Sequence, residues 1–405
     1  MSTEKIVLVG GGQASAVAAR TLRRRGHEGP IMIIGEENER PYQRPPLSKE
    51  YLTTGDGSSL DLVPVEWAEQ KDVEVRTGVR AVKVSPTDGS VLLADGTSVA
   101  ADKILLATGG SARRLPNAQG DRIHYLRTKA DADSLRAGLR PGVRVVVIGA
   151  GFIGAEVASS ARELGAEVTV LEAAPVPLQR VLGDELGAAC ARLHAKGGTD
   201  LRVNVAVESV EQRGEQVHVG TSAGTFVADL VVVGIGIIPN DGVARESGIL
   251  VDNGILVDEY CRTSMPNVFA AGDVANHYHP LFGRRMRVEH FDNANKQAAA
   301  AANNMIGRET VFDDPHWFWS DQYGANLQYV GSADPTDRLL VRGSTEDPDG
   351  WSAFFVRDRT LTAAFAMDRA EDIMVARELI HARAAIDPTM LTDGSVDLME
   401  LLEQM

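Results

Sequence analysis

The sequence predicts an α/β fold followed by a smaller α+β domain, and three features predict it. Two strand–helix–strand patterns with continuous apolar strands occupy roughly the first 240 residues, one beginning at Ile6 and the other at Val145. A glycine-rich turn follows the first strand of each pattern. Beyond residue 319 the pattern changes to consecutive short strands, which is typical of an antiparallel sheet. We therefore predict two Rossmann-like dinucleotide-binding domains plus a C-terminal α+β domain with an antiparallel sheet.

The amino-acid composition excludes several classes of protein. Its 405 residues are enough for two or three domains, and 44% hydrophobic with 24% charged residues is ordinary for a globular protein. The net charge of −15 argues against a nucleic-acid partner. No apolar run reaches the ~18 residues of a membrane span. We therefore expect no membrane partner. A strand begins by Lys5, so we also expect no signal peptide and a cytoplasmic location.

The two cysteines, Cys190 and Cys261, lie far apart in the sequence. Two cysteines are too few for a disulfide scaffold or a cysteine zinc site, and without a close pair such as Cys-x-x-Cys we expect no redox-active dithiol. We expect no metal site.

Strand and helix signals follow in a regular order. Apolar runs alternate with amphipathic segments in the first part of the chain, and β-branched and aromatic runs predominate at its end. The expected strands are Ile6–Val9, Ile31–Ile34, Val73–Arg76, Ala81–Val84, Val91–Leu93, Ile104–Leu106, Val145–Ile148, Val168–Leu171, Val217–Gly220, Leu230–Val233, Val268–Ala270, Leu327–Val330, Leu339–Arg342, Ser352–Val356 and Leu361–Phe365. The expected helices are Ser15–Arg25, Phe152–Leu164, Asn293–Met305 and Arg369–Ala382.

The second glycine-rich turn fits the G-x-G-x-x-G fingerprint of a dinucleotide site. Gly149 permits the tight turn, Gly151 lets the backbone approach a pyrophosphate, and Gly154 lets the helix pack on the strand. Glu172 ends the next strand, 23 positions after Gly149, where a carboxylate accepts hydrogen bonds from ribose hydroxyls. The same carboxylate repels a 2′-phosphate. We therefore predict NADH rather than NADPH.

The first turn is a variant of the same fingerprint. Gly10 and Gly12 occupy the first two glycine positions, and Ser15, which is also small, replaces the third. Glu36 follows the next strand, 26 positions after Gly10. One such match is weak evidence, but two in one chain, each between a strand and a helix, predict two dinucleotide sites.

The loop from Arg40 to Lys49, RPYQRPPLSK, is the most specific stretch. Its prolines fix an extended loop with a cation at each end. With the two fingerprints, it resembles the FAD-containing ferredoxin reductases of the putidaredoxin reductase type. These have a glutathione-reductase-like fold and serve bacterial monooxygenases and ring-hydroxylating dioxygenases. The resemblance covers essentially the whole chain and implies FAD and NAD as cofactors.

The resemblance also implies roles for single residues. It places Arg44 near the FAD phosphates and Lys49 near the flavin N5 and the nicotinamide, where a cation favours the anionic reduced flavin. Glu156 matches the glutamate that reaches toward the flavin–nicotinamide contact, and we expect it to pair with Lys49. We therefore predict Lys49 and Glu156 as the catalytic residues.

Further positions that match the family's cofactor-binding motifs are Thr108, Gly109, Arg127, Gly236, Asp273 and Trp319. The resemblance places Trp319 beside the flavin, near the docking site of the iron–sulfur partner. Where the family usually has Trp behind the isoalloxazine, this chain has Phe291, so we expect different packing there.

From these assignments we expect an FAD-binding domain formed by residues 1–113 and 242–318, an NAD-binding domain at 114–241 and a C-terminal domain at 319–405. The predicted activity is that of an NADH-dependent flavoprotein reductase. It passes electrons from NADH through FAD to a [2Fe–2S] ferredoxin that feeds a monooxygenase or dioxygenase.

Two alternatives stay open: a rubredoxin reductase, and an FAD- and NADH-binding redox sensor similar to apoptosis-inducing factors. The chain is expected to be a monomer or a homodimer. An acidic ferredoxin needs a basic docking face, and two arginine clusters are candidates: Arg284, Arg285 and Arg287, and Arg338, Arg342 and Arg357.

Overall fold

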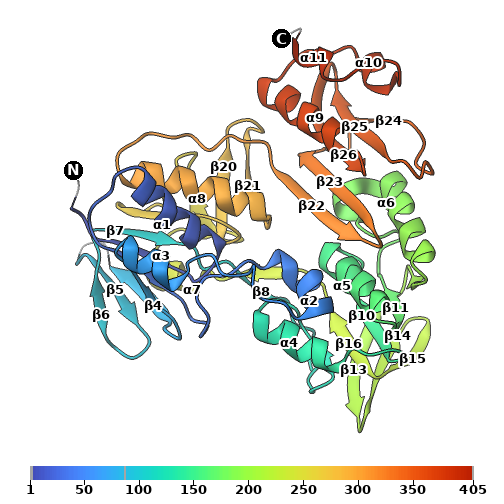
Figure 1. The fold of residues 1–405 in the computed structure, drawn as a ribbon, viewed down its shortest axis with the longest axis horizontal. Coiled ribbons are helices and arrows are strands. Elements are labelled where there is room, and N and C mark those ends of the chain that lie inside the picture. Colours follow the sequence, from blue (N-terminus) through green and yellow to red (C-terminus); the bar gives the residue numbers. More distant parts are fainter. Residues whose placement is uncertain (1–2, 86–87, 404–405) are drawn as a thin grey trace. The chain divides into compact units, whose positions relative to one another are not determined.

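The computed structural model describes residues 3–85 and 88–403, which form two compact units (Figure 1). The first unit is built from the segments up to Gln43, Ser58–Ser111 and Ile238–His316. The second unit is built from Arg44–Gly57, Ala112–Ile237 and the segment from Trp317 onward. Both units are therefore discontinuous in sequence.

A five-stranded parallel sheet forms the centre of the first unit, in the order β19-β7-β1-β2-β3. Successive side chains of a strand point to opposite faces. Ile6 and Leu8 of β1 pack with the helices α1 and α8, whereas Val7 and Val9 pack with the three-stranded sheet β4-β5-β6. Both faces of the parallel sheet are thus covered, which explains its continuous apolar strands.

The elements of the first unit are β1 (Ile6–Val9), α1 (Gln13–Arg24), β2 (Ile31–Ile34), α3 (Val65–Gln70), β3 (Val73–Arg76), β4 (Ala81–Ser85), β5 (Ser90–Leu93), β6 (Ser98–Ala100), β7 (Lys103–Leu106), α7 (Gly242–Glu246), β18 (Ile255–Val257), β19 (Val268–Ala270), β20 (Ala275–His279), β21 (Arg284–Arg287) and α8 (Phe291–Met305). The short strands β8 (Gly110–Ala112) and β17 (Ile237–Pro239) lie where the chain passes between the units.

The second unit contains a second parallel sheet, in the order β12-β11-β10-β16-β9, and an antiparallel sheet, β13-β14-β15. The elements of this part are η1 (Pro45–Ser48), α2 (Glu50–Thr54), β9 (Ile123–His124), α4 (Lys129–Gly138), β10 (Arg144–Ile148), α5 (Phe152–Glu163), β11 (Glu167–Leu171), α6 (Gln179–Lys196), β12 (Asp200–Arg202), β13 (Val207–Arg213), β14 (Gln216–Thr221), β15 (Gly224–Ala228) and β16 (Leu230–Val233).

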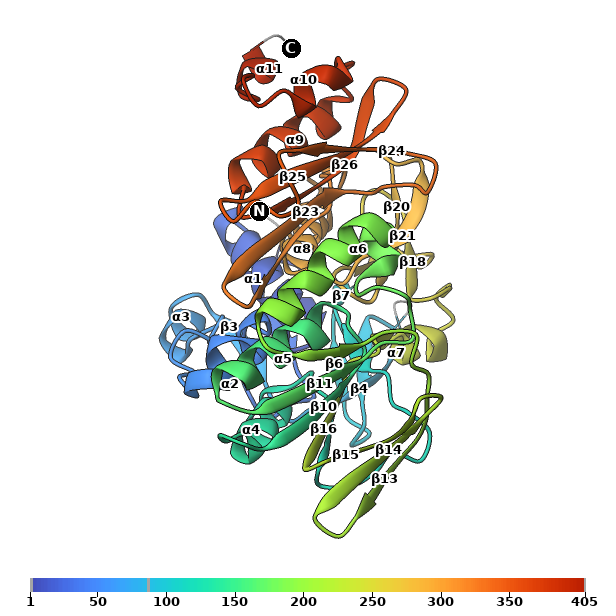
Figure 2. The same ribbon diagram turned by 90° about the vertical axis from the view of Figure 1, so that its right-hand side faces the viewer.

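The C-terminal part of the second unit is an antiparallel sheet in the order β22-β23-β26-β25-β24 (Figure 2). Its elements are β22 (Trp317–Gln322), β23 (Ala325–Gly331), β24 (Arg338–Arg342), β25 (Trp351–Arg357), β26 (Thr360–Met367), α9 (Ala370–Ala382), α10 (Pro388–Thr392) and α11 (Glu400–Glu403). Phe318, Tyr329 and Phe365 of this sheet pack against Leu182 and Leu186 of α6.

The predicted fold class is confirmed. Each of the two units contains a sheet of parallel strands with a glycine-rich turn, and the antiparallel sheet follows in the sequence. None of the helices in the described residues is long and apolar enough to cross a membrane.

Candidate functional site: two dinucleotide cradles and a buried ion pair

The first fingerprint lies in the first unit, between β1 and α1. Gly10 has φ = +127°, and a Cβ there would lie 2.1 Å from the carbonyl oxygen of Ala107, so only glycine fits. A Cβ on Gly12, in contrast, would meet nothing within 4 Å. Ser15 is fully buried, and its Oγ has no hydrogen-bond partner among the described residues. The turn is therefore tight at its start and open where a ligand would approach.

Two further predicted segments lie against this turn. The contact of Gly10 with Ala107 brings Thr108 and Gly109 beside it. Gly272, which precedes Asp273, is close to α1, since a Cβ on it would lie 3.4 Å from that of Ala14. Asp273 is half-buried after β19. The first unit thus gathers three of the predicted motifs at the carboxyl ends of adjacent parallel strands, where α/β sheets bind ligands.

Glu36 follows β2 at the surface of the first unit. Its side chain is 70% exposed and lies 3.7 Å from the guanidinium of Arg80. A pair this exposed contributes little to stability, so Glu36 is available to a ribose.

The second fingerprint lies between β10 and α5 in the second unit. A Cβ on Gly154 would lie 2.0 Å from the carbonyl oxygen of Gly149, so helix and turn can approach only because no side chain is present. A Cβ on Gly151 would meet nothing within 4 Å. Gly236 lies in the loop after β16, where its carbonyl accepts from the Arg113 amide. The neighbouring Gly234 touches Gly149, so both loops meet at one end of the sheet.

Glu172 closes this turn from the end of β11. Its carboxylate accepts hydrogen bonds from the backbone amides of Ala150, at 2.7 Å, and Ala174, at 2.8 Å. The side chain is only half-buried. The Glu172 carboxylate therefore lies against the glycine-rich turn, at the position of the fingerprint's acidic residue.

Lys49 and Glu156, the two predicted catalytic residues, form an ion pair in the second unit. The Lys49 Nζ lies 2.9 Å from the Glu156 Oε2, and the two side chains are 13% and 4% exposed. Lys49 also donates to the Pro45 carbonyl and lies 5.9 Å from the ring centre of Trp319. Glu156 is in the second turn of α5, the helix that begins at the second fingerprint. The pair is thus fixed directly to the predicted NAD site.

Two serines complete this network and were not predicted from the sequence. Ser48 Oγ donates to Oε2 of Glu156 at 2.5 Å, and Ser320 Oγ donates to Oε1 at 2.7 Å. Ser160 donates to the Ser48 carbonyl at 2.7 Å. Every oxygen of the Glu156 carboxylate therefore has a partner, which a buried charge requires.

Trp319 is on β22, in the same strand as Ser320. It stacks with Trp317, two positions earlier on the same face, at a centroid distance of 5.4 Å. Ser320 points to the opposite face and reaches Glu156. One strand therefore presents an indole to Lys49 and a hydroxyl to its carboxylate partner.

Arg44 and Arg127 also meet in the second unit, through a hydrogen bond of 2.8 Å from Arg44 Nη1 to the Arg127 carbonyl. The Arg127 amide in turn donates to Asp131 in the first turn of α4. The predicted residues therefore form two sets, each placed within its own unit.

Most guanidinium groups of the two arginine clusters are engaged in local structure. Arg285 donates to the carbonyls of Val257 and Asn276, and Arg287 pairs with Glu289 at 2.8 Å. Arg342 donates to the carbonyls of Leu391, Asp393 and Val396, and Arg357 pairs with Asp337 at 2.7 Å. Arg338, at the start of β24, is exposed.

Both cysteines are free thiols in the protein interior. Burial raises the pKa of Cys190 to about 12 and raises that of Cys261 further. Each thiol is buried in the core of its own unit, Cys190 in the second unit and Cys261 in the first.

Each cradle has the features of a site for a dinucleotide. The residues that begin the two helices, Gly12 and Gly151, lie in open space, and among the described residues no side chain caps either helix. Uncapped amides at a helix N-terminus suit a pyrophosphate. The buried, unpartnered Ser15 hydroxyl points to a polar ligand at the first cradle.

Comparisons with known proteins agree with this geometry. Residues 4–298 match the family model for pyridine nucleotide-disulphide oxidoreductases, and residues 317–402 match that for the reductase C-terminal domain. The ferredoxin–NAD(+) reductase component of the anthranilate 1,2-dioxygenase system of Burkholderia cepacia is 40% identical over 406 residues, covering 99% of this chain and 100% of the relative. Putidaredoxin reductase of Pseudomonas putida is 35% identical over 411 residues, covering 99% and 97%.

Similar solved structures also belong to ferredoxin reductases. The crystal structure of the covalent putidaredoxin reductase–putidaredoxin complex matches with a TM-score of 0.96 at 35% identity, covering 100% of this chain and 99% of the other. A ferredoxin reductase from Rhodopseudomonas palustris matches with a TM-score of 0.94 at 36% identity, covering 98% and 99%. The resemblance inferred from the motifs is confirmed. The chain is a member of the pyridine nucleotide-disulphide oxidoreductase family, in its ferredoxin–NAD reductase branch, whose enzymes use FAD and NAD(H).

Proposed function

We propose that the protein is an NADH-dependent flavoprotein reductase that supplies electrons to a [2Fe–2S] ferredoxin of a monooxygenase or dioxygenase system. The observation that carries the proposal is the buried pair of Lys49 and Glu156, which is built onto the helix of the second fingerprint. The names of its full-length relatives support the identity of the acceptor.

In this proposal, residues 1–113 and 242–318 hold FAD, residues 114–241 hold NADH, and residues 319–405 form the C-terminal domain. The residues that would bind FAD are Gly10, Gly12, Ser15, Glu36, Arg44, Thr108, Gly109, Arg127, Asp273 and Trp319. Gly149, Gly151, Gly154, Glu172 and Gly236 would bind NADH. Because NADH is a cytoplasmic reductant, we infer a cytoplasmic location.

When bound, FAD accepts two electrons together from NADH and releases them one at a time to a carrier. The protein residues supply position and charge. Glu156 and its two serine donors hold the Lys49 ammonium in one place, so that its positive charge is preorganised. The uncapped amides of α5 orient the pyrophosphate, and Glu172 disfavours a 2′-phosphate on the adenosine ribose.

The proposal is tested by anaerobic titration of the purified protein with NADH, followed by addition of an oxidised [2Fe–2S] ferredoxin. We expect the flavin absorbance to bleach with NADH and to return when the ferredoxin is added. Bleaching without recovery would contradict the ferredoxin assignment and favour rubredoxin or a sensor role. A protein that binds no FAD would contradict the assignment of the first cradle.

A further inference from the structure

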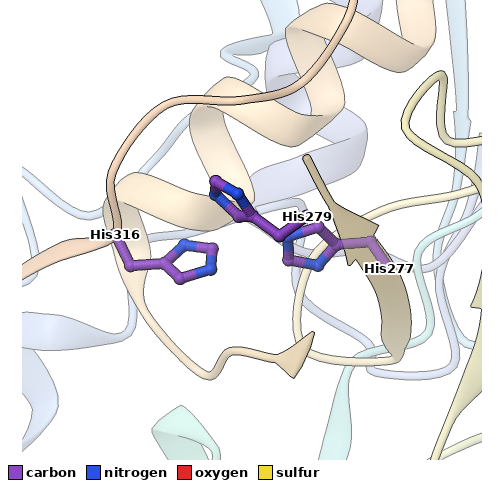
Figure 3. A group of neighbouring side chains, drawn as sticks. All are labelled: His277, His279 and His316. Carbon is purple, nitrogen blue, oxygen red and sulfur yellow. The ribbon is translucent and has the colours of Figure 1, made fainter. Parts of the chain in front are cut away.

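A cluster of three histidines lies in the first unit, and none of its members belongs to either fingerprint (Figure 3). His277 and His279 alternate along β20, so their side chains lie on the same face of the strand. His316 comes from the segment that follows α8 and ends immediately before β22. All three are buried, with 1%, 0% and 4% of their surface exposed. Two distant segments thus bring three imidazoles together in the interior.

The spacing of these rings is close to that of a metal site. One ligand nitrogen from each ring lies within 4.8 Å of the others. The ring centroids of His279 and His316 are 4.7 Å apart, and that of His277 lies 5.3 Å and 5.2 Å from them. Ligands around a tetrahedral Zn²⁺ at 2.0–2.1 Å are separated by about 3.4 Å. The χ2 torsion of histidine has a broad energy minimum, so rotation of the rings can bring the nitrogens from within 4.8 Å to the separation found around zinc.

Two of the three rings, those of His277 and His316, have ring nitrogens without ordinary partners among the described residues. Among the described residues, no hydrogen bond of normal geometry reaches either ring nitrogen of His316 or of His277. His277 lies opposite Met286 on the β20–β21 ladder, and the Met286 backbone makes no hydrogen bond of normal geometry to the His277 ring. Buried polar groups are nearly always satisfied, so two unsatisfied imidazoles facing a third indicate a missing ligand.

The hydrogen bond of His279 is of the kind that metal ligands make. Its Nε2 lies 3.0 Å from the Asp314 carbonyl oxygen. A carbonyl can only accept, so the proton is on Nε2 and the lone pair is on Nδ1. Metal-ligating histidines commonly donate their second ring N–H to a carbonyl in this way, which fixes tautomer and ring orientation.

Neutral imidazoles are the form that binds metals. Arg285, which lies opposite Tyr278 on the β20–β21 ladder, donates to the carbonyls of Val257 and Asn276.

We propose that His277, His279 and His316 bind one divalent transition-metal ion, and that the ion is Zn²⁺. Three neutral imidazoles with no thiolate are a ligand set that zinc accepts readily. The site would be structural, because Phe282 and Phe312 pack around it and neither fingerprint belongs to it. The ion would join β20 to the segment that leads into β22.

The first test uses the intact flavoprotein. The protein is stripped with a chelator and titrated with zinc against a chromophoric competitor. Bound metal is counted by mass spectrometry, and the zinc-loaded protein is measured by X-ray absorption. We expect one Zn²⁺ per chain, three imidazole nitrogens at about 2.0 Å, and a higher melting temperature with zinc. Stripped protein that binds no zinc, or zinc whose first shell lacks three imidazoles, would overturn the proposal.

Variants locate the site. His316→Gln and His279→Gln should each weaken zinc binding by about tenfold or more, in the range seen when metal sites lose supporting residues. His27→Gln is the matched control, because His27 is 4% exposed in the same unit but is not one of the three clustered histidines. It should bind zinc as the unaltered chain does. Equal affinity in all variants would refute the site. If a variant does not fold, the X-ray absorption of the unaltered protein decides.

Discussion

The Nζ of Lys49 lies 2.9 Å from the Oε2 of Glu156, in a pair that is almost closed to solvent. Their nearest partners come from two separate elements: the Pro45 carbonyl and the Ser48 hydroxyl of η1, and the Ser320 hydroxyl of β22. If one charge of a buried ion pair is removed, the other stays buried without compensation and the protein is destabilised. A substitution in this pair is therefore expected to change both the rate of flavin reduction and the stability of the fold. A single and a double variant distinguish these two effects.

Lys49→Met should lower both flavin reduction and stability. The substitution leaves the Glu156 carboxylate buried without its cation, which costs about 3–5 kcal/mol. It also removes the charge that favours reduced flavin, so we expect reduction by NADH to slow by about 100-fold, the loss typical of one preorganised electrostatic group. Urea denaturation measures the first effect and anaerobic stopped-flow absorbance the second.

The double variant Lys49→Met/Glu156→Gln is the matched control, because it removes both charges. It should regain most of the lost stability while flavin reduction stays slow. Recovery of the rate together with the stability would mean that Lys49 acts only through folding.

Glu172 sets the choice of nicotinamide in our assignment. Glu172→Ser removes the charge that repels a 2′-phosphate, so the preference for NADH over NADPH, measured as the ratio of kcat/KM values, should fall about tenfold to 100-fold, the range for charged hydrogen bonds. Glu36→Ser removes the corresponding acid of the first fingerprint and should leave the ratio unchanged. An unchanged ratio in Glu172→Ser would remove this residue from the ribose site.

Ferredoxin docking should depend on salt, because a chain with net charge −15 can steer an acidic carrier only through local basic groups. We expect kcat/KM for ferredoxin to fall as ionic strength rises. Arg338→Ser should lower it by up to about fivefold at low salt, since an exposed charge contributes up to about 1 kcal/mol. Turnover with ferricyanide should not change. A response that is flat with salt would exclude electrostatic docking.

Stability should fall in mild acid because of His194. This ring is 1% exposed, lies 2.9 Å from the Tyr323 hydroxyl, and burial lowers its pKa to about 4. Between pH 6.5 and about 4 the unfolded state binds the proton and the folded state does not, so stability decreases as pH falls through this window.

At pH 5 the loss from this one group is about 2 kcal/mol relative to pH 7. Urea unfolding of His194→Gln should show a loss smaller by that amount, while the remaining acid sensitivity comes from other buried histidines such as His124, whose pKa is lowered by burial. An identical loss in the variant would show that His194 does not contribute.

The central strands were predictable because they are buried on both faces. Ile6–Val9, Ile31–Ile34 and Leu230–Val233 have the bounds that their apolar runs predict. The helix Gln179–Lys196 was not predicted, because Gly183, with φ = +74°, breaks its helical geometry. The hairpin of β20 and β21 was missed as well, since its strands contain mainly polar residues.

The site residues that are local in sequence could also be predicted, whereas those that are distant in sequence could not. The glycines of both fingerprints are local in sequence and were recognised from spacing alone. The partners of Glu156 were not, because Ser48 and Ser320 lie 108 and 164 positions away. Hydroxyl groups at such separations carry no pattern in the sequence. The HxH spacing of His277 and His279 was a visible signal, but its third member lies on another segment.

The deep burial of both thiols has a consequence for durability. A reduced flavin generates peroxide in air, and peroxide attacks cysteine through the thiolate form. With the pKa of Cys190 near 12 and that of Cys261 higher still, almost no thiolate forms at neutral pH. The enzyme should therefore resist oxidative ageing during turnover, and purified stocks should keep their activity without a thiol reductant.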